Sequence, residues 1–223
     1  MTPLAGLIAA SLAFFGTHIA MSHPLRPWLM KLGERGFQLV YNLVSLATLV
    51  WMVIAFRAAP PADLPGSGAI GWIAATILTL PAVLLFLGSM SPRNPSMPLP
   101  GAAEAARAGP AGVFTVTRHP MMWGFALWAV SHLVLWWSLR TVVVSIAILA
   151  LALIGARLQD AKKRVQMGDA WSAWEAKTSF NPRLAGFVNV GWKGWASATL
   201  AWGVLTWVHL PLAGIEAGLL RWV

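Results

Sequence analysis

Long apolar stretches alternate with short polar segments along the whole chain. Six of these stretches approach the roughly 20 residues that an α-helix needs to cross a bilayer, and they cover residues 4–21, 37–56, 69–90, 121–139, 142–158 and 195–212. Each is predicted to span a membrane as a helix. Only Leu139-Arg140-Thr141 separates the fourth stretch from the fifth, which predicts a tight helical hairpin, and Pro81 predicts a kink in the third.

Composition agrees with this pattern. The 223 residues are 58% hydrophobic and only 10% charged, whereas soluble domains carry about 25% charged residues. No period of 20 to 50 residues repeats along the chain, so an array of repeats is not expected. The predicted fold is therefore all-α: a polytopic membrane helical bundle of about six transmembrane helices, in a single domain over residues 1–223.

Three longer polar segments follow the odd-numbered apolar stretches. Residues 22–37 mix apolar and basic side chains, which predicts a short interfacial element. Residues 91–117 are rich in Pro and Gly, and we expect an irregular segment that either wanders or folds back over a site. In residues 157–193, apolar positions that include Trp171 and Trp174 recur at helical spacing. This pattern predicts two short amphipathic helices on the membrane surface, ended by Pro182.

The basic residues are distributed unevenly between the two kinds of loop. Thirteen of the 16 Lys and Arg residues follow odd-numbered stretches, and the other three are Arg57, Arg140 and Arg221. By the positive-inside rule, both termini are expected outside and the three long loops in the cytoplasm; in a bacterium this is an inner membrane protein with periplasmic ends. The net charge of +9 then indicates contact with anionic membrane lipid and no nucleic acid partner.

The chain contains no cysteine. Disulfides, zinc–cysteine sites, iron–sulfur clusters and thiolate-ligated haem are therefore excluded. Any metal must be held by His, Met, carboxylate or water.

Three of the five histidines, His18, His132 and His209, lie inside predicted spans. Ionisable side chains in a bilayer are costly and are functional candidates by default, although a neutral histidine can also simply hydrogen-bond a neighbouring helix. For His209, near an outer end, this second interpretation is favoured. Phe14 lies near His18, and Trp128 and Trp136 share a face with His132 on a continuous helix.

Two helices that each offer one imidazole in an aromatic wall provide what a six-coordinate haem b requires. His18 and His132 are therefore the predicted iron ligands, with His23 and His119 in reserve. At 1.5 Å per residue, His18 lies about 6 Å from Ser22, whereas His132 lies about 18 Å from Pro120. We expect the first helix to continue toward Arg26, which would reduce the mismatch to roughly 6 Å.

The turn Arg118-His119-Pro120 precedes the fourth span. Pro120 suits the first turn of a helix, which leaves His119 at the cap. The Arg118 cation and the helix-capping residue His119 can bind an anionic group such as a haem propionate. Arg118 and His119, with Trp128 and Phe14 deeper in the spans, are the predicted cofactor-binding residues.

Three blocks of sequence resemble the NnrU family: GTHIAMSHPLRPWLMKLGERGFQLVYNLVSLATLVW, TRHPMMWGFALWAVSHL and GDAWSAWEAKTSFNP. The resemblance covers nearly the whole chain and implies a role in nitric oxide metabolism and denitrification. Plant and cyanobacterial relatives are 15-cis-zeta-carotene isomerases, membrane haem b proteins whose two histidine ligands match His18 and His132. The resemblance thus implies redox-linked isomerisation of a lipophilic small molecule, or a step in nitrogen-oxide metabolism. Ala129 stands where the isomerases carry a cysteine, so a switch to thiolate ligation is unavailable.

The stretch RHPMMWG is also similar to the RHPxYxG motif of isoprenylcysteine and phospholipid methyltransferases. That resemblance implies an S-adenosylmethionine site at Arg118 and His119, with Asp160 nearby. The departures are Met122 in place of Tyr, and Gln159-Asp160 in place of a Glu-Glu pair. A non-catalytic assembly or sensing protein is a third alternative.

These alternatives make different predictions for the histidines. We expect His132→Ala to abolish haem retention, because the apolar pocket then offers no other nitrogen. His18→Ala should weaken retention with partial rescue by His23, and His119→Ala should leave the Soret spectrum of the detergent-purified protein nearly intact. Loss of haem in His119→Ala with retention in His132→Ala would place the metal at the Arg-His-Pro turn.

Overall fold

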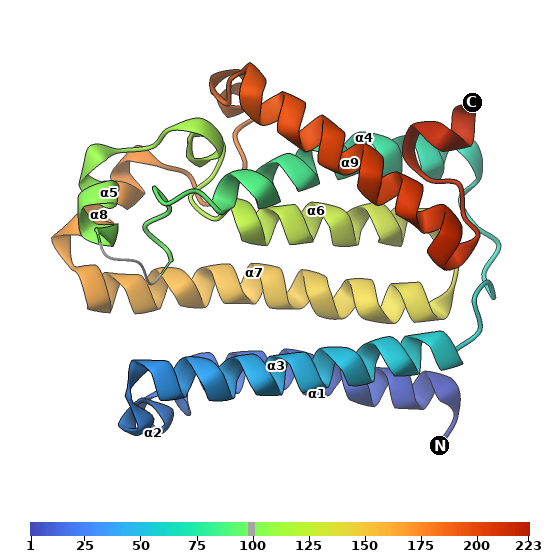
Figure 1. Cartoon of the computed structure of the whole chain (residues 1–223), viewed down its shortest axis with the longest axis horizontal. Helices are drawn as coiled ribbons and strands as arrows, with labels where there is room; N and C mark the ends of the chain where they lie inside the picture. Colours follow the sequence, from blue (N-terminus) through green and yellow to red (C-terminus); the bar gives the residue numbers. More distant parts are fainter. Residues whose placement is uncertain (98–100) are drawn as a thin grey trace.

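Six long helices run alongside one another in the computed structural model, which describes residues 1–97 and 101–223 (Figure 1). They are α1 (Pro3–Ser22), α3 (Gly33–Ala58), α4 (Gly68–Ser89), α6 (Pro120–Leu135), α7 (Leu139–Met167) and α9 (Trp192–Ala213). The described residues contain no strand. The predicted all-α membrane bundle is therefore confirmed.

Five of these helices are long and apolar enough to cross a membrane: α1, α3 with the short helix before it, α4, α7 and α9. The sixth, α6, is apolar but has only 16 residues. It ends four residues earlier than predicted, because Trp136 adopts a left-handed conformation at φ 46°. The predicted tight hairpin between α6 and α7 is confirmed. Its turn is residues 136–138 and not 139–141, because α7 already begins at Leu139, capped by the Ser138 hydroxyl.

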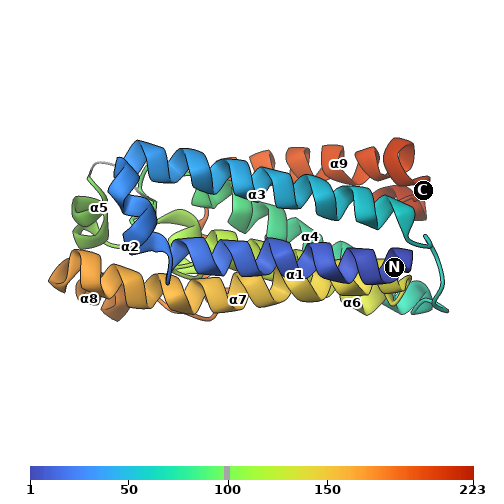
Figure 2. The ribbon, with the colours of Figure 1, turned by 90° about the horizontal axis from the view of Figure 1, so that it is seen from below.

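The six helices pack in a defined order that differs from their order in the sequence. Contacts join α3 to α1, α1 to α7, α7 to α6, α6 to α4, and α4 to α9. The same order is visible in Figure 1, and Figure 2 shows α1 beside α3 along its length. Consequently α7 packs against both α1 and α6 and lies between them in Figure 1.

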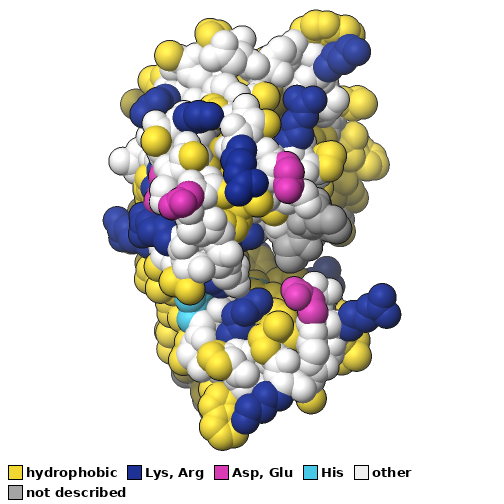
Figure 3. Space-filling view, turned by 90° about the vertical axis from the view of Figure 1, so that its left-hand side faces the viewer, with side chains coloured by type: hydrophobic (Ala, Val, Ile, Leu, Met, Phe, Trp, Pro, Cys, Tyr) yellow, Lys and Arg dark blue, Asp and Glu magenta, His cyan; other side chains and the backbone are white. Residues whose placement is uncertain are grey.

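The two ends of the bundle differ in charge. We call one end the termini end, because both chain termini lie there. At the other end lie the loops after α1, α4 and α7, which contain α2 (Arg26–Leu29), α5 (Ala102–Ala108), α8 (Asp169–Lys177) and the 3₁₀ turns η1 (Met30–Leu32), η2 (Gly112–Thr115) and η3 (Leu184–Asn189). Figure 3 shows Lys and Arg side chains gathered on this face, which we call the basic end. The predicted grouping of the basic loops at one end is thus found.

The loop after α7 differs from its prediction. The first of the two predicted surface helices is instead a polar continuation of α7 up to Met167, and α8 ends at Lys177, before Pro182. Trp171 and Trp174 do not lie on the membrane surface, since they are 0% and 1% exposed. The reason is that α5 and η2, from the Pro- and Gly-rich segment, fold back and cover them.

That segment, residues 91–117, was predicted either to wander or to fold back. Residues 98–100 lie outside the described part, and the remainder contains α5 and η2. The loop after α1 carries the predicted short interfacial element, α2, whose Trp28 is 71% exposed. The two loops therefore contribute to the basic end in different ways. The loop after α4 packs over a small core there, whereas the loop after α1 presents apolar side chains outward.

The packing of α6 on α4 depends on a glycine. A Cβ atom at Gly124 would lie 2.8 Å from the carbonyl oxygen of Ala82 and 3.1 Å from the backbone nitrogen of Phe86. These neighbours are backbone atoms that cannot rotate away. Gly124 therefore sets how closely the two helices approach each other.

Gly124→Ala is expected to lower the free energy of unfolding by about 1–3 kcal/mol, as for other overpacked cores. Thermal unfolding in detergent, followed by tryptophan fluorescence, would measure the loss. Gly203→Ala on α9 is the matched control, because a Cβ there meets nothing within 4 Å. Equal stability of the two variants would show that the α4–α6 contact adjusts freely.

Candidate functional site

A buried carboxylate lies at the centre of the basic end. Asp160 belongs to the polar continuation of α7, just past the apolar residues 142–158. The Arg118 side chain donates from Nε to both Asp160 oxygens, at 3.1 and 3.0 Å, and from Nη2 to Oδ2 at 2.7 Å. The imidazole of His119 donates from Nε2 to Oδ1 at 2.8 Å. His119 and Asp160 are only 2% and 3% exposed, so this three-residue cluster is withdrawn from water.

The chain positions Arg118 and His119 through backbone contacts with the segment after α8. The Arg118 N–H donates to the Ser179 carbonyl at 2.8 Å, and the Thr117 hydroxyl donates to the Phe180 carbonyl at 2.7 Å. The indole of Trp123 donates to the same Phe180 carbonyl at 2.8 Å. With Pro120 at the first position of α6, as predicted, these bonds fix the direction in which both side chains leave the turn.

Further polar side chains extend the cluster. Oε1 of Gln159 lies 3.2 Å from Nδ1 of His119. Glu175, on α8, pairs with Arg164 at 2.7 Å and lies 3.5 Å from the Arg118 guanidinium. α7, α8 and the turn before α6 are thereby connected through charged groups.

The electrostatics of Asp160 follow from these contacts. Burial alone would raise the pKa of its carboxyl, but the hydrogen bonds from His119 and Arg118, together with their positive charge, hold that pKa at about 2. The carboxylate is thus ionised at neutral pH. Its charge serves to retain Arg118 and His119 rather than to exchange a proton near neutral pH.

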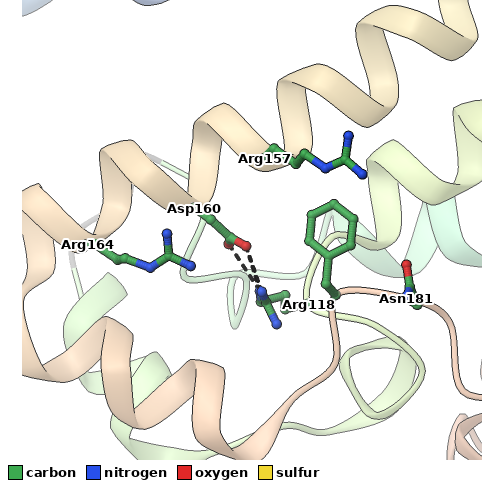
Figure 4. A pocket seen from close by; sticks show the side chains of 6 residues that line it. Arg118, Arg157, Asp160, Arg164 and Asn181 are labelled. Carbon is green, nitrogen blue, oxygen red and sulfur yellow. Dashed lines mark hydrogen bonds and ion pairs between the residues drawn. The ribbon is translucent and has the colours of Figure 1, made fainter.

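Beside this cluster lies a cavity of about 320 Å³ (Figure 4). Its lining residues are Arg118, Arg157, Asp160, Arg164, Phe180 and Asn181, and we call it the arginine pocket. The guanidinium groups of Arg118 and Arg157 lie 5.5 and 5.9 Å from the centre of the Phe180 ring. The pocket therefore combines cationic groups, an aromatic surface and a side-chain amide.

The charges of the pocket do not balance. Arg118 and Arg164 are paired with Asp160 and Glu175, whereas Arg157 has no hydrogen bond or ion pair within the described residues. One guanidinium group is thus left to attract a ligand. A carboxylate or phosphate matches its planar set of donors.

Sequence reasoning selected Arg118, His119 and Asp160, and the structure brings these three together. Gln159, which was noted only as a departure from the methyltransferase motif, lies beside His119. Sequence reasoning missed Arg157, Arg164, Glu175, Phe180 and Asn181. A signal for two of these was present: residues 157, 160 and 164 have the 3- and 4-residue spacing that places side chains on one face of a helix. The contribution of residues 175–181 depends on the path of the chain after α8, which no local pattern indicates.

The structure does not bring His18 and His132 together. α1 ends at Ser22, so the expectation that it continues toward Arg26 is wrong. His18 thus lies four residues from the basic end of α1, whereas His132 lies three residues from the end of α6 at the termini end. The two histidines thus lie toward opposite ends of the bundle, on helices that both pack against α7, and their role as a ligand pair stays a prediction.

The aromatic residues predicted beside these histidines are placed as follows. Phe14 is 9% exposed and packs against His18, with ring centres 4.3 Å apart. Trp128 contacts His132 at the same ring distance. Trp136 does not share their face, because it lies past the end of α6 and is 47% exposed.

Two reserve ligands also have defined surroundings. Nδ1 of His23 lies 2.9 Å from the Ser22 hydroxyl, and both ring nitrogens of His119 face oxygen atoms of Gln159 and Asp160. Within residues 1–97 and 101–223, no group of three or more His, Asp or Glu residues is arranged to hold a metal ion.

The fold and this cluster define a class of protein: a helical membrane bundle with a buried Arg-His-Asp site at its basic end. The family model described as NnrU protein matches residues 6–217. The chain therefore belongs to the NnrU family. No curated protein and no solved structure matches it.

Asp160→Asn is expected to lower the free energy of unfolding by about 3 kcal/mol, because it removes the nearest counter-charge of the half-buried Arg118 guanidinium. A second expectation concerns pH. The folded pKa lies near 2 and the unfolded value near 3.9, so the stabilisation is complete above about pH 4 and is lost as pH falls toward 2.

Thermal unfolding of the two proteins between pH 2 and 7 would measure both effects. The difference in stability between wild type and variant should shrink below pH 4. Asp169→Asn is the control, since this carboxylate is exposed and makes no ion pair within the described residues. A difference that stays constant down to pH 2 would contradict the assigned role of the Asp160 charge.

Proposed function

We propose that this NnrU-family protein binds a carboxylate-bearing small molecule in the arginine pocket, and that the ligand is S-adenosylmethionine, used to methylate a lipophilic substrate. The observation that carries the proposal is the unpaired Arg157 beside the Arg118–His119–Asp160 cluster. The three residues that the resemblance to membrane methyltransferases selected, Arg118, His119 and Asp160, all belong to this region.

The parts of the pocket suit the parts of this cofactor. Arg157 offers a free guanidinium group to the carboxylate of the amino-acid portion, and the Phe180 ring offers a face for a planar base. Asp160 also lines the pocket and brings a carboxylate near the cofactor's ammonium and sulfonium groups. When bound, S-adenosylmethionine supplies an electrophilic methyl group; the protein's own contribution is to bind and orient.

The position of the pocket supports this use. It lies at the level of residues 157–164 of α7, immediately past the apolar residues 142–158. A water-soluble cofactor and a lipid-dissolved substrate can meet only near such a boundary. We further propose that the basic end faces the cytoplasm of a bacterial cell, because the positive-inside rule assigns the basic loops to that side.

Arg157→Gln is expected to weaken binding of S-adenosylmethionine by about 10- to 100-fold, which corresponds to the 1.5–3 kcal/mol of a hydrogen bond to a charged group. Calorimetric titration of the detergent-purified protein measures this. Arg93→Gln, which removes an exposed cation at the same end and does not line the pocket, should bind like wild type.

A cofactor analogue tests the assigned contact directly. Decarboxylated S-adenosylmethionine lacks the group that Arg157 is proposed to bind, so it should bind wild type and Arg157→Gln with equal affinity. Absence of saturable binding by S-adenosylmethionine and its demethylated product would reject the proposal. A penalty for Arg157→Gln that is the same with both cofactors would show that this arginine acts only on the shape of the pocket.

Haem b binding, with a role in nitrogen-oxide metabolism or in isomerisation of a carotenoid-like molecule, is the second candidate. One observation favours it: Nδ1 of His132 donates to the Trp128 carbonyl at 2.8 Å, and Nε2 has no partner within the described residues. This is the arrangement of a histidine that binds metal through Nε2. The Soret band of protein expressed with ample haem tests this candidate.

A further inference from the structure

Two lysines at the basic end carry charges that no acidic side chain balances. Lys162 and Lys163 lie in the polar continuation of α7, and neither forms an ion pair in the part of the chain that the structure describes. Lys163 is only 7% exposed, and its Nζ donates to the Pro95 carbonyl at 3.0 Å. A carbonyl oxygen accepts a hydrogen bond but does not neutralise an ammonium group, and a buried charge without a counter-charge is costly. An anion from outside the chain would remove this cost.

A third cation reaches the same region from another loop. Arg26 begins α2, in the turn after α1, and α1 packs against α7 and runs to the same end. Burial lowers the pKa of Lys162 and Lys163. Positive charge lowers it further: that of Arg26 for Lys162, and those of Lys162 and Arg26 for Lys163. The three groups are thus close enough to repel one another.

The surface of the basic end is hollowed between α2 and the side that carries α5 and α8. Figure 3 shows this hollow, with Lys and Arg side chains on both sides of it. Arg26 belongs to the α2 side, whereas Lys163 is bound, through Pro95, to the loop that contains α5. Glu34, the acidic residue closest to Arg26 in the sequence, is exposed and forms no ion pair within residues 1–97 and 101–223. Positive charge therefore collects here without compensation.

The α2 segment has the character of a membrane interface. Leu25, Trp28 and Leu32 are 48%, 71% and 60% exposed, and the Lys31 ammonium lies 4.4 Å from the centre of the Trp28 ring. Exposed Leu and Trp side chains beside Lys and Arg are typical of segments at the level of lipid headgroups. An anion bound beside α2 would have an apolar surface next to it, which suits an amphiphile better than a free inorganic anion.

We propose that Arg26, Lys162 and Lys163 bind the phosphate of one anionic glycerophospholipid, whose acyl chains lie against the exposed apolar residues of the α2 segment. The phosphate oxygens accept from the guanidinium and the two ammonium groups, and the negative charge offsets part of their mutual repulsion. This site differs from the arginine pocket, which none of the three residues lines, and it does not depend on methyl transfer. Bound lipid joins α2 to α7.

The test compares three probes on the full chain, purified in detergent and freed of lipid: dioctanoyl phosphatidylglycerol, dioctanoyl phosphatidylcholine and glycerol 3-phosphate. Native mass spectrometry at increasing probe concentration gives a dissociation constant for each. Phosphatidylglycerol should bind about tenfold more tightly than phosphatidylcholine, whose choline group is repelled by the three cations. Glycerol 3-phosphate should bind more weakly than phosphatidylglycerol, because it has no acyl chains.

Arg26→Gln and Lys162→Gln should each weaken phosphatidylglycerol binding about fivefold, the effect of one cation near anionic lipid. Arg183→Gln is the matched control, since it removes an exposed cation at the same end that forms no ion pair among the described residues; it should bind like wild type. Without lipid, Arg26→Gln and Lys162→Gln should melt no lower than wild type, because each removes one of three mutually repelling charges. Lost affinity then cannot be ascribed to unfolding.

The contrary results are equally definite. Equal affinity of wild type for the two lipids, or an equal loss of affinity in Arg183→Gln, would overturn the site. Glycerol 3-phosphate that binds as tightly as phosphatidylglycerol would show a site for a free anion and would overturn the lipid assignment. A lower melting temperature of both lipid-free variants would show that their charges are compensated within the protein, which would also reject the proposal.

Discussion

The charge of Asp160 governs the construction of the basic end. A carboxylate that is 3% exposed would be very costly without partners, and its partners come from a turn some forty residues earlier in the chain. Once Arg118 and His119 are bound to it, the start of α6 is fixed against α7. The segment after α8 follows, because its carbonyls accept the backbone and side-chain donors of the same turn. One buried ion cluster thereby determines where three separate segments meet.

The features that the sequence predicted correctly are those that depend on local properties of the chain. Apolar length and the distribution of basic residues are local properties, so the six helices and the charge difference between the two ends followed from them. The motif Arg118-His119-Pro120 was also identified, since its residue types are unusual beside a span. By contrast, Trp171 and Trp174 were assigned to the membrane surface. Their pattern is that of an amphipathic helix, which is the same whether lipid or another part of the protein covers the apolar face.

The expected depth of His18 was wrong for a different reason. Depth along a helix can be estimated from sequence only if the end of that helix is known, and α1 ends at Ser22 where a longer helix was expected. Which helices are neighbours in the bundle is even harder to predict from the sequence, because helices that follow one another in the chain need not pack together. Here α7 packs between α1 and α6. His209 is distant from His132 in sequence, and only the packing of α6 and α9 on α4 brings the two rings to 6.4 Å.

The arginine pocket and the two imidazoles of His132 and His209 lie at opposite ends of the bundle. The arginine pocket is polar and charged and lies beside the last apolar turn of α7, where water can reach it. The imidazole pair lies at the other end, on two helices whose outer faces are apolar. The unpaired Arg157 of the first site is suited to the carboxylate of a water-soluble ligand. Since α6 begins at the first site with His119 and carries His132 near its other end, this one helix connects the two.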